Sequence, residues 1–212
     1  MEGAGRPKGP LVAGTANGSR PPPRTPRPAG GEARSDPPGA PAGRQNNPAQ
    51  AAESAPAVHD GSRDFDFEFG EWKIRLSRLA RPLSGSTEWI EYEGTSVVRT
   101  VWNGRANLGE LEVEGPDGRI QGLSLRLYDP ASGQWRIHWA NSRDGALGEA
   151  MVGGFRDGIG EFYNQEDFDG RSIFVRFLFT EITPTSFRLE QAFSADGGKT
   201  WEVNWIARFD KR

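Results

Sequence analysis

The amino-acid sequence predicts an all-β domain over residues 64–212, an antiparallel up-and-down barrel of about ten strands. From residue 64 onward, short segments of alternating apolar and polar residues are separated by turn sequences, with hardly a helical stretch. These turns are too short to hold a crossover helix, so neighbouring strands must pair antiparallel. A train of hairpins has two exposed edges unless its last strand meets its first, which favours a closed barrel.

The composition changes sharply near residue 64. Residues 1–63 contain twelve of the sixteen prolines, no Phe, Trp or Tyr, eight Lys or Arg, and five Asp or Glu. Such a Pro/Gly/Arg-rich segment buries too little apolar surface to offset its chain entropy, so we predict a disordered tail. The basic, Pro-rich run at residues 20–28 could bind a proline-recognising module or an anionic surface, or be a solvated leader without a function. The remaining residues, about 150, suffice for one domain with its own core.

Composition also limits the compartment and the partners. The chain has no Cys, which excludes disulfides, thiolate metal sites and a cysteine nucleophile. No apolar run resembles a secretory signal or approaches the roughly 18 residues of a membrane span. We therefore expect a cytoplasmic protein without a membrane partner. Residues 64–212 carry eighteen Lys or Arg against twenty-four Asp or Glu, a balance that argues against a nucleic-acid partner. The sequence leaves the oligomeric state open.

The strands are expected at regular intervals along the barrel. Phe65-Asp66-Phe67-Glu68-Phe69 leads into Gly70-Glu71-Trp72, after which Ile74 and Leu76 continue the alternation of the first strand. The other strands are expected at residues 88–98, 108–114, 120–128, 135–141, 149–155, 160–164, 172–180, 187–194 and 201–209. Asp-Gly turns separate several of them, because Gly supplies the positive φ of a tight hairpin. A β-sandwich is the alternative, but no long Greek-key connection is present.

Several motifs together resemble a known family. They are Asp64-Phe65-Asp66-Phe67, Gly70-x-Trp72, and the segments at residues 122–129, 152–155, 181–186 and 190–202. With these motifs the chain resembles bacterial lipocalin-like (calycin-type) barrels of unassigned function, over the whole predicted barrel and none of the tail. Relatives tend to carry a polar His-Asn pair where this chain has Arg75-Leu76, so no role of that pair is transferred here.

The resemblance implies a structural role for Trp72. In lipocalin-like folds this indole closes one end of the barrel, and a cation from the last strand covers it. Arg208 is the candidate cation, with Lys211 or Arg212 as alternatives.

The period of two assigns the side chains of the later strands to two faces. The apolar set must point inward, because so much exposed aromatic surface would cause aggregation. Its members are Trp135, Ile137, Trp139, Phe155, Ile173, Val175, Phe177, Phe179, Phe187, Leu189, Gln191, Phe193, Trp201, Val203, Trp205 and Phe209. Arg176, Glu190 and Asn204 share the other face and would form a charged ladder outside the barrel. If the faces were inverted, these three residues would form a polar cluster in the cavity.

We predict a small-molecule-binding barrel that holds a mostly apolar ligand in an aromatic-lined cavity. The predicted ligand-binding residues are Trp139, Phe155, Tyr163, Phe177, Gln191 and Trp205. Gln191 is a polar residue on the apolar face. Tyr163 lies on the same face of its strand as Glu161, and the alternation does not show whether that face points inward. Both could orient a ligand, or bond each other or a buried water. The alternatives are a cofactor-free enzyme (isomerase, cyclase or hydrolase) that uses the same cavity, and a filled-core structural or interaction module.

His138 is the one histidine of residues 64–212, so it is the residue to consider as a haem ligand or as a general base. It lies on the polar face beside Arg136, which predicts an exposed imidazole, and no carboxylate stands near it in sequence to orient it. We therefore expect no cofactor and no metal, and we assign no catalytic residue. The sequence also has no G-x-S-x-G, P-loop, dinucleotide or H-E-x-x-H motif.

Overall fold

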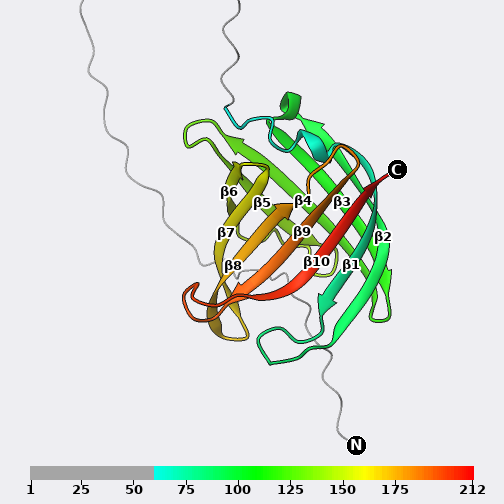
Figure 1. The fold of residues 1–212 in the computed structure, drawn as a ribbon, viewed down its shortest axis with the longest axis vertical. Helices are drawn as coiled ribbons and strands as arrows, with labels where there is room; N and C mark the ends of the chain where they lie inside the picture. The colour runs from blue at the N-terminus through cyan, green and yellow to red at the C-terminus, as the bar shows by residue number, and fades with distance from the viewer. Residues whose placement is uncertain (1–59) are drawn as a thin grey trace, which may run out of the picture. The chain divides into compact units, whose positions relative to one another are not determined.

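A computed structural model describes residues 60–212, which form a closed antiparallel barrel (Figure 1). Each strand pairs with the next along the chain, and β10 pairs with β1, so the predicted fold class is confirmed. The strands are β1 (Gly70–Leu79), β2 (Trp89–Val101), β3 (Ala106–Gly115), β4 (Gly118–Asp129), β5 (Gln134–Asn141), β6 (Met151–Arg156), β7 (Ile159–Phe168), β8 (Arg171–Thr180), β9 (Ser186–Ser194) and β10 (Glu202–Lys211). The predicted tail falls almost entirely outside the described residues.

Tight turns hold consecutive strands in register. Asp157 and Gly158, between β6 and β7, have φ angles of 53° and 77°, and Asp169 and Gly170, between β7 and β8, have φ angles of 50° and 73°. Two central residues with positive φ match the twist of the flanking strands, which explains the Asp-Gly sequences. Two short 3-10 helices complete the fold, η1 (Asp66–Glu68) and η2 (Trp102–Gly104), and no helix among the described residues is long and apolar enough to span a membrane.

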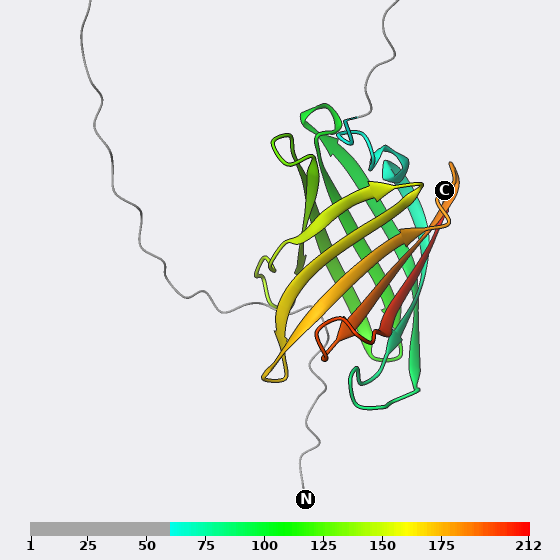
Figure 2. The ribbon, with the colours of Figure 1, turned by 60° about the vertical axis from the view of Figure 1, so that its left-hand side comes forward.

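The segment before β1 closes one end of the barrel. It contains η1 and runs across that end, drawn in cyan in Figure 2. Phe65 is fully buried in a cluster of aromatic rings, four of which have centroids 4.9 to 5.7 Å from its own. Its neighbours, with which it forms what we call the aromatic plug, are Phe67, Trp135, Phe155, Phe162 and Phe179. Burial of these rings, at roughly 25 cal/mol per Å², stabilises this end of the barrel.

Trp72 lies beneath this segment, as the resemblance implies. Its indole is fully buried, and its Nε1 donates a hydrogen bond of 2.7 Å to the backbone carbonyl of Glu68. The covering cation is Lys211, whose Nζ lies 4.2 Å from the ring centroid, and the expectation of Arg208 is wrong. Trp72 pairs directly with Lys211 across the closing β1–β10 ladder, whereas Arg208 lies opposite Arg75 and bonds Glu181.

A bulge in β10 changes the predicted faces of that strand. Val203 lies opposite Ala192 and Trp205 lies opposite Gln191, so Asn204 is an extra residue in the ladder. The inward face therefore resumes at Trp205, whereas Trp201 packs on the outer-face side chains Arg176 and Tyr163. The prediction that Trp201 and Val203 point inward is wrong, because strict alternation cannot continue through a bulge.

Candidate ligand-binding site

The barrel wall is weakest between β5 and β6. These strands pair at only three positions, Trp135 with Gly153, Arg136 with Val152 and Ile137 with Met151. Beyond Ile137 the two strands separate, and the connecting residues 142–150 bond back to β5, where Gly148 donates its N–H to the carbonyl of Trp139 at 2.7 Å. A hollow in the wall follows from this early separation.

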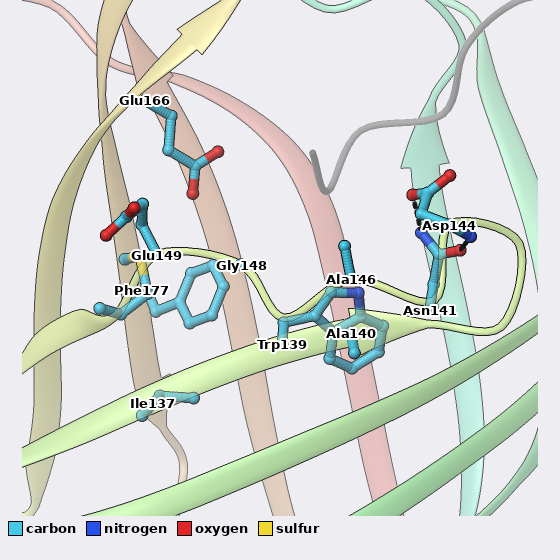
Figure 3. A pocket seen from close by; sticks show the side chains of 11 residues that line it. Ile137, Trp139, Ala140, Asn141, Asp144, Ala146, Gly148, Glu149, Glu166 and Phe177 are labelled. Atoms are coloured by element: carbon cyan, nitrogen blue, oxygen red, sulfur yellow. Dashed lines mark hydrogen bonds between the residues drawn. The ribbon is translucent and has the colours of Figure 1, made fainter. Parts of the chain in front are cut away.

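Two adjacent spaces lie at this position. The outer hollow, of about 20 Å³, is shown in Figure 3 and is lined by Ile137, Trp139, Ala140, Asn141, Asp144, Ala146, Gly148, Glu149, Met151, Glu166 and Phe177. The inner cavity, of about 40 Å³, is lined by Leu111, Ser124, Arg126, Ile137, Trp139, Phe177, Phe179, Leu189, Gln191, Trp205, Ala207 and Phe209. Ile137, Trp139 and Phe177 belong to both walls, so the cavity and the hollow adjoin at these three side chains.

The structure brings four of the six predicted site residues together. Trp139, Phe177, Gln191 and Trp205 all line the inner cavity. Phe155 points inward but belongs to the aromatic plug. Tyr163 lies on the outer face, where 42% of it is exposed and its hydroxyl bonds the Glu161 carboxylate. A ligand-binding role remains a prediction for the four residues at the cavity.

Gln191 has a buried partner that the sequence pattern misplaced. Its side chain is 3% exposed, and its Nε2 donates a hydrogen bond of 2.7 Å to Oδ1 of Asn204. The bulge turns Asn204 inward, where it is fully buried, so its predicted place in an outer ladder is wrong. Arg176 and Glu190 do lie outside, Arg176 over the Trp201 ring and Glu190 in an ion pair with Arg188.

Arg126, on β4, is a cavity residue that sequence reasoning missed. Its Nη1 forms an ion pair with Oε2 of Glu68 at 2.6 Å and donates a hydrogen bond of 2.9 Å to Oδ1 of Asn107. Both charged side chains are at least nine-tenths buried. Burial raises the pKa of the Glu68 carboxyl, and the charge of Arg126 opposes that rise. The pair fastens the aromatic plug to the cavity wall.

Trp139 occupies space that a glycine provides. A Cβ at Gly122, on the neighbouring strand β4, would lie 2.0 Å from Cη2 of the indole. The ring therefore packs directly over the β4 backbone, and only glycine leaves room for it. Its Nε1 is buried and has no hydrogen-bond partner among the described residues. The indole is thus positioned by packing alone, at the boundary of the two spaces.

The outer hollow is acidic. Asp144, Glu149 and Glu166 contribute carboxylates to it, whereas no Lys or Arg of residues 60–212 lines it. Asn164 donates a hydrogen bond of 2.7 Å to Oε1 of Glu166. Burial raises the pKa of Glu166, and the charge of Glu149 adds to the rise while the bond from Asn164 opposes it. Within the described residues, no group of three or more His, Asp or Glu side chains is arranged to hold a metal ion.

His138 lies outside the cavity, on the outer face of β5. It is half-buried and not fully exposed as predicted, because the loop after β5 folds over it. Its Nδ1 lies 3.1 Å from the carbonyl oxygen of Gly148. The ring thus helps to hold the loop that borders the outer hollow.

Comparison with known proteins adds similarities of fold. No protein-family model matches the chain, and no curated protein matches it. The S-type phycobiliprotein lyase CPES from Guillardia theta is 11% identical, with 70% of this chain and 90% of that chain covered and a TM-score of 0.48. The protein EF1p2_mFAP2b bound to DFHBI is 12% identical (72% and 99% covered, TM-score 0.40), and a de novo designed fluorescence-activating β-barrel is 14% identical (71% and 98% covered, TM-score 0.38). Membership of a bacterial lipocalin-like family stays a prediction, and these similarities say nothing about the chemistry of this chain.

Proposed function

We propose that this barrel binds a small, mostly apolar molecule in the inner cavity. The observation that supports this proposal is the unfilled space between the aromatic plug and the β5–β6 opening, with Gln191 as a polar group among apolar walls. Small-molecule sites usually combine such walls with a few polar groups that fix orientation. The molecule would reach the cavity past Trp139 and Phe177, the side chains that both spaces share.

The size of the cavity limits the ligand. A volume of about 40 Å³ holds about three water molecules. The ligand that fits without rearrangement is therefore a molecule of only a few non-hydrogen atoms. A larger molecule, such as one with an aromatic ring, would have to extend into the outer hollow and displace Trp139 or Phe177.

A cavity-filling variant tests the proposal. Ala207 is fully buried and lines the cavity, so Ala207→Leu would fill much of the space. Val203→Leu, on the outer face of the same strand, is the matched control. We expect one-ring aromatic molecules to quench or shift the tryptophan fluorescence of the wild type and of the control, and not that of Ala207→Leu.

The outcome separates the proposal from the filled-core alternative. Equal responses of Ala207→Leu and the wild type would place the binding elsewhere. If the folded wild type responds to none of the one-ring aromatic molecules, the result would instead favour a structural or interaction module.

A further inference from the structure

Several buried N–H donors around the inner cavity have no hydrogen-bond partner among the described residues. Gln191 and Asn204 together carry four side-chain N–H groups and four lone pairs on their two carbonyl oxygens, and their mutual bond uses one N–H group and one lone pair. Three N–H groups and three lone pairs remain, so the pair can still donate a hydrogen bond to a ligand. Nδ2 of Asn204 has no partner among the described residues.

Two other cavity residues also carry unpartnered donors. Nε of Arg126 and Nε1 of Trp139 are buried without a hydrogen-bond partner in the described part of the chain. An unsatisfied buried donor costs free energy that a ligand acceptor can recover. A ligand that offers an oxygen acceptor is therefore favoured over a purely apolar one of the same shape.

The charges around the cavity disfavour an ionised ligand. Arg126 is the one charged residue in the cavity wall as the structure describes it, and Glu68 neutralises it at 2.6 Å. An anion would also have to pass the carboxylates of the outer hollow. A cation could pass them, but it would then lose its hydration among apolar walls and N–H donors.

We infer that the ligand is an uncharged molecule with a hydrogen-bond acceptor, such as a ketone, aldehyde, amide or lactone, which accepts a hydrogen bond from Gln191 at the cavity wall. This inference rests on the proposed function and specifies its ligand class. The Gln191–Asn204 pair then serves as the polar anchor, and the aromatic side chains define the shape of the remaining space.

Four matched one-ring probes test the inference on the full-length wild-type chain at pH 7. Acetophenone is the uncharged acceptor, ethylbenzene the apolar analogue that lacks the carbonyl oxygen, benzoate the anion and benzylammonium the cation. Tryptophan fluorescence titration gives each dissociation constant. We expect acetophenone to bind about tenfold more tightly than ethylbenzene, the effect of about one net hydrogen bond, and both ions to bind more weakly than either.

Variants then locate the contact. Gln191→Met combined with Asn204→Leu removes the amide pair and is expected to reduce the preference for acetophenone to less than about twofold while ethylbenzene still binds. Tyr163→Phe, on the outer face, is the matched control and is expected to keep the full preference. If the double variant does not fold, the ranking of the four probes on the wild type decides the question.

The possible failures are distinguishable. Tightest binding of ethylbenzene, or of either ion, would overturn the ligand class and leave the cavity as a binding site. An acetophenone preference that survives loss of both amides would overturn the role of Gln191. No binding of any probe would contradict the proposed function together with this inference.

Discussion

Replacing Arg126 with Met tests the buried ion pair of the barrel. The substitution keeps an aliphatic stem against the Phe65 ring, over which the guanidinium lies at 4.9 Å, and removes the charge. Glu68 is 1% exposed, so its carboxylate would remain in the interior without a counter-charge. Breaking a buried pair in this way costs about 3–5 kcal/mol, and we expect the free energy of unfolding at pH 7 to fall by that amount.

The pH dependence gives this prediction a distinctive signature. Burial already raises the pKa of Glu68 with Arg126 present, and the loss of Arg126 removes the opposing effect. A raised folded-state pKa means that stability is fully present below the unfolded value, about 4.3, and is lost as the pH rises towards the folded value. The variant should therefore recover stability on acidification, by up to about 1.4 kcal/mol per pH unit, relative to the wild type.

Urea unfolding between pH 4.5 and pH 8 measures both effects. Glu68→Gln combined with Arg126→Met is the control, because it has no ionisable group at the pair, and its stability relative to the wild type should vary much less with pH. The reasoning would be refuted by a loss below about 1 kcal/mol for Arg126→Met at pH 7, or by a pH profile parallel to that of the control.

Three further predictions concern the rest of the barrel. Hydrogen bonds from its own turn lower the pKa of Asp196 to about 2, so its contribution to stability is present above about pH 4 and is lost towards pH 2; the stability difference between the wild type and Asp196→Asn should shrink over that range in acid titrations. Gly153→Ala should lower the unfolding free energy by about 1–3 kcal/mol, because its Cβ would meet the Glu161 carbonyl oxygen at 1.9 Å, whereas Gly154→Ala has open space and serves as the control. Trp72→Phe should cost about 1–3 kcal/mol in urea unfolding, because a buried carbonyl loses its indole donor, and an unchanged midpoint would contradict that role.

The sequence was sufficient to predict the barrel because hairpin turns and alternation are local signals. The Asp-Gly pairs have the positive φ angles that two-residue turns require, and residues such as Phe177 and Gln191 face inward as alternation predicts. The structure of residues 194–200 also depends on interactions between residues that are close in sequence. Asp196 accepts hydrogen bonds from the side chain of Ser194 and from backbone N–H groups that follow it, so this part of the family-like motif at residues 190–202 builds a turn.

The parts that sequence reasoning missed depend on contacts between distant residues. On β4, Leu123, Leu125 and Leu127 alternate with Ser124 and Arg126, yet the polar pair lines the cavity and the leucines face outward, half-buried. Hydrophobic periodicity alone would place the leucines inside the barrel and the polar pair outside. The buried charge of Arg126 is paired with Glu68, which η1 brings across the end of the barrel from outside the strands.

The three-position pairing of β5 with β6 has a consequence for kinetics. Hydrogen bonds at a short ladder open more easily than those of the long β1–β2 and β7–β8 ladders, so local opening at this seam does not require global unfolding. Amide hydrogens near residues 138–153 should accordingly exchange with solvent faster than those of the closing β1–β10 pair. A bound molecule would then leave at the frequency with which the seam opens, and its residence time would depend on the β5–β6 ladder as well as on its contacts within the cavity.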